Sequence, residues 1–175
     1  LGLIAGKQFQ NPIKEGAFLV TGSTHKTFYG SQRGLILSSM DEEPWRKIDR
    51  GAFPGSSSNH HLHTLAQMAL CTFEMMDFGD RYAADVIRNA KALAAALDRQ
   101  GFDVQGKEFG FTESHQVAVN AKACGGGEKV SRTLEANDIT LTMNMLPREP
   151  LSNRDRPDGL RLGGQEMTRS GMGAL

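Results

Sequence analysis

The feature that most constrains the fold of this chain is an amphipathic pattern between residues 83 and 97. The apolar residues of this stretch recur every three or four positions and so share one face of a helix: Ala83, Ile87, Ala90, Leu93, Ala94 and Leu97. Arg88 and Lys91 lie off that face, and Gly101 follows as a helix-ending residue. The pattern predicts a helix packed on one side against a core.

A second helical pattern precedes the first. Its apolar positions again have helical spacing: Leu62, Leu65, Ala66, Ala69, Phe73 and Met76. Ser58 or Asn59 is predicted as the N-cap, because short polar side chains accept from the first free N–H groups of a helix. Gly79 is predicted as the glycine that ends this helix. The sequence therefore predicts two helices separated at Gly79.

Short apolar runs on both sides of these helices predict strands. Residues 18–20 and 35–37 are expected as core strands joined by a polar loop, and residues 116–119, 139–143 and 160–162 as strands around a helix at 129–136. The glycines at 125–127 are expected to form a turn before that helix. The change in texture near Asp80 suggests two units, 1–79 and 80–175.

The charge balance excludes some classes of partner. Among 175 residues, 20 Lys+Arg face 20 Asp+Glu, which favours neither nucleic acid nor an anionic membrane surface. No apolar run approaches the ~18 residues of a membrane span, so a cytoplasmic location is expected. Cys71 and Cys124 form no CxxC pair and are expected to be small buried hydrophobic residues. Because the chain opens at Leu1 without an initiator methionine, it is expected to be a fragment.

A lysine among polar residues follows the first predicted strand. Lys26 is flanked by Ser23, Thr24, His25 and Thr27. A lysine at a strand end can form a Schiff base with a carbonyl if burial or neighbouring cations lower its pKa. The alternative is a solvated loop lysine, since most lysines are exposed. Spacing alone leaves both interpretations open.

Two histidines, His60 and His63, would share one face of a helix. Imidazole is a common metal ligand, but no carboxylate or HExxH pattern accompanies this pair. Capping and packing at the start of a helix explain the pair better, so no metal site is predicted.

Arg161 lies between Leu160 and Leu162 in a run that is expected to be buried. A buried guanidinium needs an anionic partner, because its charge cannot be lost. That partner is either a ligand carboxylate or phosphate, or an intramolecular ion pair with Asp158 or Glu166.

The segment at residues 20–28, VTGSTHKTF, resembles the cofactor-lysine segment of serine hydroxymethyltransferases. Further stretches resemble that family in the same order along the chain: 1–6, 11–12, 34–37, 52–55 with His63, 89–93, 101–102, 113–115, 136–140, Asn144 with Pro147, 159–163 and 168–171. The resemblance is specific because the matches keep their order from end to end, not because any one motif is unique.

The resemblance implies an α/β fold, a fragment of the aspartate-aminotransferase-like architecture. Residues 1–79 would be the end of the large domain that binds pyridoxal phosphate, and residues 80–175 a connecting helix and part of the small α+β domain. Lys26 would hold the cofactor as a Schiff base, with catalytic roles for Thr24 and His25 beside it. The residues implied in cofactor binding are Lys26, Ser23, Thr24, His25, Gly55, Ser58 and Asn59. Arg161 would bind the carboxylate of the amino-acid substrate, and Asn144 would contact the pterin of tetrahydrofolate.

The implied activity is the interconversion of serine and glycine with tetrahydrofolate as one-carbon carrier, in a homodimer or tetramer whose subunits share active sites. Alone, this piece is expected to have little or no activity. Two departures, Gly-Ser-Gln-Arg-Gly at 30–34 in place of Gly-Pro-Arg-Gly-Gly and Ser-Ser-Ser-Asn at 56–59 in place of glycines, keep alternatives open. These are a 2-methylserine hydroxymethyltransferase and a folate-independent β-hydroxy-amino-acid aldolase. The resemblance leaves a third alternative, a non-catalytic truncated protein of the same fold, because the family's other cofactor-binding and catalytic residues would lie upstream of Leu1.

Overall fold

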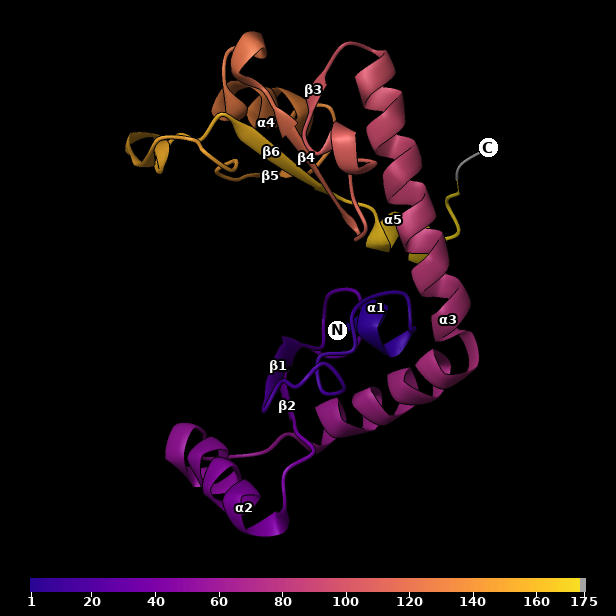
Figure 1. The fold of residues 1–175 in the computed structure, drawn as a ribbon, viewed down its shortest axis with the longest axis vertical. Coiled ribbons are helices and arrows are strands. Elements are labelled where there is room, and N and C mark those ends of the chain that lie inside the picture. Colours follow the sequence, from indigo (N-terminus) through magenta and orange to yellow (C-terminus); the bar gives the residue numbers. More distant parts are fainter. Residues whose placement is uncertain (174–175) are drawn as a thin grey trace. The chain divides into compact units, whose positions relative to one another are not determined.

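The computed structural model describes residues 1–173 and divides the chain into two compact units, Leu1–Ala83 and Ala84–Leu175. Figure 1 shows the elements of each unit. One long helix, α3 (Leu62–Arg99), contributes its first part to the first unit and the rest to the second. Among the described residues, no helix combines the length and the apolar character needed to cross a membrane.

The first unit carries a two-stranded antiparallel sheet between short helices. Its elements are α1 (Gly2–Ala5), β1 (Val20–Ser23), β2 (Gly34–Leu37), α2 (Glu42–Arg50) and a kinked turn at Gly51–Ser56, in which Phe53 has an extended backbone. Val20 pairs with Leu37, and Ser23 pairs with Gly34. The two predicted strands are therefore confirmed, with the first beginning two residues later than expected.

These strands do not form a core, contrary to the prediction. Phe18 is 67% exposed, and both strands are at most half-buried. Phe28, Cys71 and Met75 make the core of this unit instead, where the loop after β1 packs on α3. A two-stranded sheet buries little apolar surface by itself. The buried apolar side chains of this unit therefore lie where the loop after β1 contacts α3.

The predicted break at Gly79 is wrong, because α3 is continuous through this residue. A Cβ built on Gly6 would lie 2.5 Å from the Gly79 carbonyl oxygen and 2.5 Å from the Ala83 Cβ. The segment after α1 thus approaches the helix as closely as small residues allow, which explains a glycine inside it. The predicted N-cap is also wrong: α3 begins at Leu62, and Asn59 Oδ1 accepts from the N–H of His60 instead.

The second unit contains a four-stranded antiparallel sheet in the order β3-β4-β6-β5. The strands are β3 (Asp103–Val104), β4 (Gln116–Asn120), β5 (Thr142–Met143) and β6 (Gly159–Gly163), and the helices are α4 (Gly127–Glu135) and α5 (Gln165–Arg169). Short 3-10 turns lie at Lys107–Phe109, Lys122–Cys124 and Leu151–Asn153. The strands predicted at 116–119 and 160–162 are confirmed, whereas the one predicted at 139–143 is reduced to two residues.

The glycine turn before α4 is confirmed. Gly125 and Gly126 have φ values of +98° and +90°, a left-handed region that favours glycine, and Gly127 begins the helix. Cys71 is buried as expected, but Cys124 at the neighbouring turn is exposed, because it lies outside both cores.

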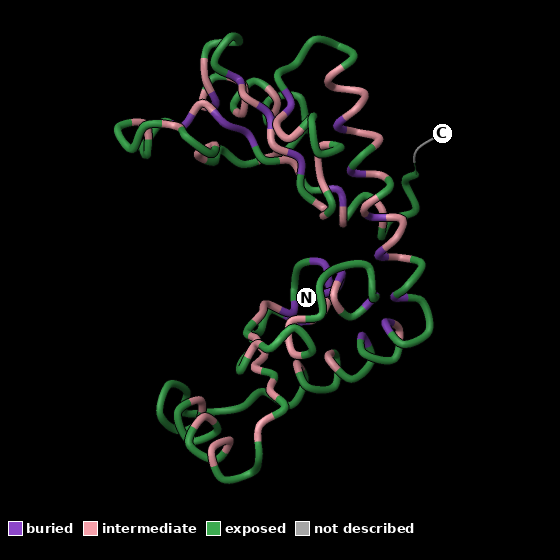
Figure 2. The backbone as a smooth tube through the Cα atoms, viewed as in Figure 1, coloured by how far each residue is buried: buried purple, intermediate pink, exposed green. Residues whose placement is uncertain are grey.

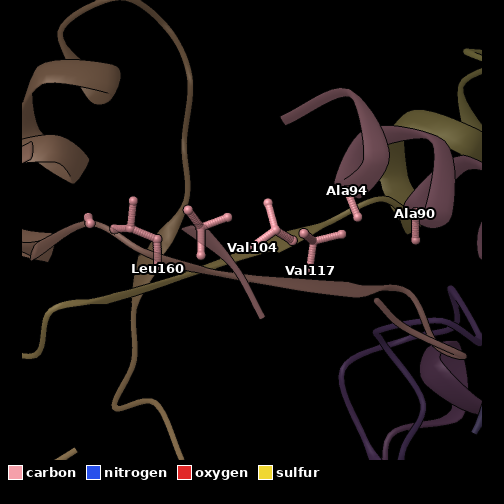
Figure 3. Close-up of a cluster of buried hydrophobic side chains, with 7 residues drawn as sticks. Ala90, Ala94, Val104, Val117 and Leu160 are labelled. Carbon is pink, nitrogen blue, oxygen red and sulfur yellow. The ribbon is translucent and has the colours of Figure 1, made fainter. Parts of the chain in front are cut away.

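The core of the second unit forms where α3 packs on the sheet. Figure 3 shows Ala90 and Ala94 of α3 near Val104, Val117 and Leu160 of three strands, and Figure 2 shows the buried positions along these elements. Leu93 and Leu97 pack against this cluster. The helix face predicted from residues 83–97 is therefore the face that builds the core.

Candidate functional site

Thr24 closes the base of the loop that carries Lys26, here called the neck of the loop, where residue 24 meets residues 30–33. The Thr24 hydroxyl lies 2.6 Å from the Ser31 carbonyl oxygen and 2.9 Å from that of Arg33, and it accepts from the Arg33 N–H at 3.2 Å. The Thr24 N–H donates to the Arg33 carbonyl at 2.9 Å, and the Gly30 N–H donates to the Thr24 carbonyl at 2.7 Å. Only 1% of Thr24 is exposed. One buried side chain thus fixes both ends of the loop.

A second buried threonine, Thr27, fastens the same loop to α1. Its Oγ1 accepts from the N–H of Gly2 at 2.9 Å and lies 3.5 Å from the Leu1 amino nitrogen. A Cβ built on Gly2 would lie 2.0 Å from the Thr27 carbonyl oxygen, so the two backbones are in close contact. Lys26 therefore lies between two anchored threonines.

Lys26 itself is exposed and lines an open pocket of about 890 Å³ in the first unit. Ser23 and Arg33 line the pocket with it from the strand ends, and Ser56 and Ser57 line it from the turn after α2. The volume lies within the range typical of small-molecule sites. Lys26 is the one lysine among the described residues of this pocket, so its primary amine lines the pocket together with serine residues and Arg33.

These residues suit a cofactor that carries an aldehyde and a phosphate, such as pyridoxal phosphate. A primary amine is the group that bonds to an aldehyde, and a guanidinium with hydroxyl groups is a usual environment for phosphate. The hydroxyls of Ser56 and Ser57 donate to the carbonyls of Gly51 and Ala52, at 2.8 and 2.7 Å. Those bonds hold the turn in shape beside the pocket.

Several residues predicted for the site lie outside this pocket. Thr24 is buried and absent from the lining, and its hydroxyl is bonded to the backbone of Ser31 and Arg33. The others are exposed and absent from the lining: His25, Gly55, Ser58 and Asn59. That Arg33, Ser56 and Ser57 line the pocket was not predicted from the sequence. The available signal was that all three lie in the two segments that depart from the family pattern.

The Thr24 hydroxyl gives a direct test of how the loop is held. In Thr24→Val the side chain keeps its shape but loses its hydroxyl, so the buried Ser31 carbonyl and the Arg33 N–H lose their bonds to it, while the Arg33 carbonyl keeps the bond from the Thr24 N–H. We expect the free energy of unfolding of the first unit to fall by about 1 to 2 kcal/mol. Urea unfolding followed by the fluorescence of Trp45, the single tryptophan, measures the change. An unchanged midpoint would contradict the role given to Thr24.

Arg161 in the second unit is exposed, which corrects the expectation of a buried guanidinium. It lies in β6, where side chains alternate between the two faces: Leu160 is buried, and Arg161 is not. Among the described residues, Arg161 forms no ion pair with Asp158 or Glu166. The intramolecular alternative is therefore wrong, and the guanidinium is available to a ligand.

Asn144 lies on a segment next to Arg161. Its N–H donates to the Gly159 carbonyl at 3.0 Å, and Thr142 pairs with Arg161 across β5 and β6. The two residues predicted to bind substrate and folate therefore belong to neighbouring segments of one sheet edge. The Asn144 side chain is exposed and accepts from the Thr142 hydroxyl at 3.2 Å.

The histidines before and within α3 do not build a metal centre. The rings of His61 and His63 stack with centroids 5.7 Å apart. Within residues 1–173, no three His, Cys, Asp or Glu side chains gather closely enough to hold a metal ion. His61 instead contacts the Arg33 guanidinium through Nδ1.

Glu149 holds together the loop that joins Asn144 to β6. Its carboxylate accepts from the N–H groups of Asp158 and Leu146 at 2.7 and 2.9 Å and from Asn153 Nδ2 at 3.2 Å. These bonds, the one from Asp158 first, lower the pKa of Glu149. The stabilisation is therefore present above the ordinary carboxyl pKa and is lost as pH falls through the lowered one.

Glu149→Gln should remove this pH dependence. We expect a loss of about 0.5 kcal/mol in unfolding free energy at neutral pH, a small value because water screens this site. The difference from the unmodified chain should shrink at acid pH, where the native carboxyl is protonated. Urea unfolding at both pH values measures it, with Glu108→Gln, an exposed carboxyl, as control. A difference that grows on acidification would contradict the assignment.

Comparisons with known proteins identify one family over nearly the whole chain. The family model described as serine hydroxymethyltransferase matches residues 1–174. Serine hydroxymethyltransferase from Thermoplasma volcanium is 51% identical over 99% of this chain, and that from Archaeoglobus fulgidus is 54% identical over 98%. The chain spans 41% and 39% of the lengths of these two relatives.

A solved structure shares the fold. The crystal structure of L-threonine transaldolase from Pseudomonas fluorescens, in its internal aldimine state, superposes with a TM-score of 0.86 at 36% sequence identity. The match covers 98% of this chain and 38% of that protein. The chain therefore has the fold of part of a larger enzyme.

Proposed function

Because the chain belongs to the serine hydroxymethyltransferase family, we propose that it is part of a pyridoxal-phosphate enzyme that interconverts serine and glycine with tetrahydrofolate as one-carbon carrier. The observation that carries this proposal is the exposed Lys26 amine on a loop anchored by Thr24 and Thr27, facing a pocket with serine hydroxyls. Residues 1–79 would belong to the large domain and residues 80–175 to the connecting helix and small domain.

When bound, the cofactor supplies an electron sink for breaking bonds at the substrate Cα. In this proposal Lys26 attaches it and Ser23 offers a hydroxyl toward its polar groups. Ser56 and Ser57, whose hydroxyls donate to Gly51 and Ala52, shape the turn that borders the pocket. The other residues proposed to bind the cofactor are exposed and lie outside the pocket lining. They would contact the cofactor if their segments closed over it: His25, Gly55, Ser58 and Asn59. Thr24 positions the loop without touching the reacting atoms.

In the second unit, Arg161 would bind the carboxylate of the amino-acid substrate. It is exposed, and within the part of the chain that the structure describes it forms no ion pair with Asp158 or Glu166. A guanidinium matches a carboxylate with two parallel hydrogen bonds, which orients the substrate as well as holding it. Asn144, on the neighbouring segment, would contact the pterin. A homodimer or tetramer with shared sites and a cytoplasmic location complete the proposal.

The test is serine cleavage by the complete gene product with and without tetrahydrofolate. We expect glycine formation from serine to depend strongly on the folate. Full-rate cleavage of 3-hydroxy amino acids without folate would contradict the transferase and favour an aldolase. The 2-methylserine alternative is distinguished by offering 2-methylserine in place of serine. Absence of any cofactor-dependent reaction would favour the non-catalytic alternative.

A second candidate is an aldehyde-dependent transaldolase, which the match to L-threonine transaldolase favours. The identity of 36% is lower than the 51% and 54% of the two hydroxymethyltransferases, so the first candidate ranks above it. Supplying threonine and an acceptor aldehyde distinguishes them. A new β-hydroxy amino acid formed without folate would identify a transaldolase.

A further inference from the structure

The loop that carries Lys26 is tied to the first turn of α3 by two residues that depart from the family pattern. The buried Ser31 hydroxyl donates to the Thr64 carbonyl at 3.1 Å. The Arg33 Nε donates to Thr64 Oγ1 at 3.2 Å, and an Arg33 Nη contacts His61 Nδ1. Since arginine can only donate, the imidazole accepts in this contact.

These contacts continue directly to the neck of the loop. Thr24, two residues before Lys26, is bonded to the backbone of Ser31 and Arg33. The position of Ser31 and Arg33 is therefore linked to that of Lys26 by hydrogen bonds of the buried Thr24, although Lys26 and Arg33 are themselves exposed. Where the family usually has proline at position 31 and glycine at position 33, neither side chain could make these bonds.

We propose that Ser31 and Arg33 form a latch on Thr64 that positions Lys26 for attack on the cofactor aldehyde. They are positioning residues, because in this role they act through Thr24 and the loop and not on the reacting atoms. The inference rests on the proposed function, since it takes Lys26 as the cofactor lysine. In the step concerned, the Lys26 Nζ–carbon bond forms and the aldehyde oxygen leaves as water.

Arg33 also lines the pocket, so its charge offers a competing explanation that the test must separate. An anion-binding role would concern only a phosphorylated aldehyde. A latch concerns the geometry of Lys26 and so affects every aldehyde that reacts there. Pyridoxal and pyridoxal phosphate differ in this one group.

The experiment measures the rate at which each aldehyde attaches to Lys26 in the full chain, trapped with borohydride and quantified by peptide mapping. The variants are Ser31→Ala, Arg33→Ala and Arg33→Lys. Gln32→Ala is the matched control, because Gln32 lies between them, is exposed and is absent from the pocket lining. Labelling of the exposed Lys14 in the same samples is the internal reference, and circular dichroism checks folding.

We expect Ser31→Ala and Arg33→Ala to slow attachment at Lys26 about three- to tenfold with both aldehydes, the effect of losing ordinary hydrogen bonds. Arg33→Lys should restore part of the rate, and Gln32→Ala should match the unmodified chain. A defect confined to pyridoxal phosphate, or unchanged rates in both alanine variants, would overturn the latch alone. No labelling of Lys26 in the unmodified chain would overturn the proposed function, and the latch with it.

Discussion

Replacing Lys26 by alanine should abolish specific attachment of pyridoxal phosphate to this chain. Lys26 is the one lysine among the described residues that line the pocket, so no other amine there can replace it. We expect borohydride-trapped cofactor to fall about tenfold or more, since the nucleophile itself is lost. The visible absorption of the bound cofactor should disappear with it.

The control for this experiment is Lys14→Ala. Lys14 belongs to the same unit and is also exposed, but it is absent from the pocket lining. Its removal should leave the absorption and the trapped cofactor unchanged. The contradicting result is a Lys26→Ala variant that traps as much cofactor as the unmodified chain, with no increase in labelling of its surface lysines. In that case a different residue holds the cofactor.

The second large effect is expected at Gly159, the first residue of β6. A Cβ at this position would lie 2.3 Å from the Asn144 carbonyl oxygen and 2.5 Å from the Leu146 Cγ. Gly159→Ala must therefore push the Asn144 segment away from β6, the strand that carries Arg161. We expect a loss of about 2 to 3 kcal/mol in the stability of the second unit, as in overpacked cores.

Hydrogen exchange of the β4 and β6 amides measures this loss, because their protection reports the opening of that sheet. Gly164→Ala is the matched control: the nearest atoms to its new Cβ lie 3.9 and 4.0 Å away, in ordinary contact. Its protection should match the unmodified chain. Equal protection in both variants would show that the Asn144 segment moves without cost.

The parts of the fold that the sequence predicts are those set by local periodicity. The face of Ala90 and Ala94 follows from helical spacing, and the Gly125 and Gly126 turn follows from backbone conformations that glycine favours. The break expected at Gly79 fails for a tertiary reason. Whether a glycine ends a helix or admits a neighbour depends on Gly6, which lies 73 residues earlier in a segment that no local pattern connects to it.

The site divides in the same way. Lys26 is predicted from its position after a strand and from the resemblance. The hydrogen bonds of Thr24 within the loop and of Arg33 to Thr64 could not be predicted, because they depend on how the loop folds back toward α3. Arg161 was expected to be buried because its neighbours are apolar. Alternation along a strand places Leu160 on one face and Arg161 on the other, and only the pairing of β6 decides which face is covered.

If Lys26 is the cofactor lysine, it should carry the cofactor when the labelled peptides of the chain are mapped. The full chain is incubated with pyridoxal phosphate, reduced with borohydride and digested, and the labelled peptides are quantified. We expect one dominant adduct, on the peptide that contains Lys26. Label spread over exposed lysines such as Lys14 and Lys47, with no excess at Lys26, would contradict it.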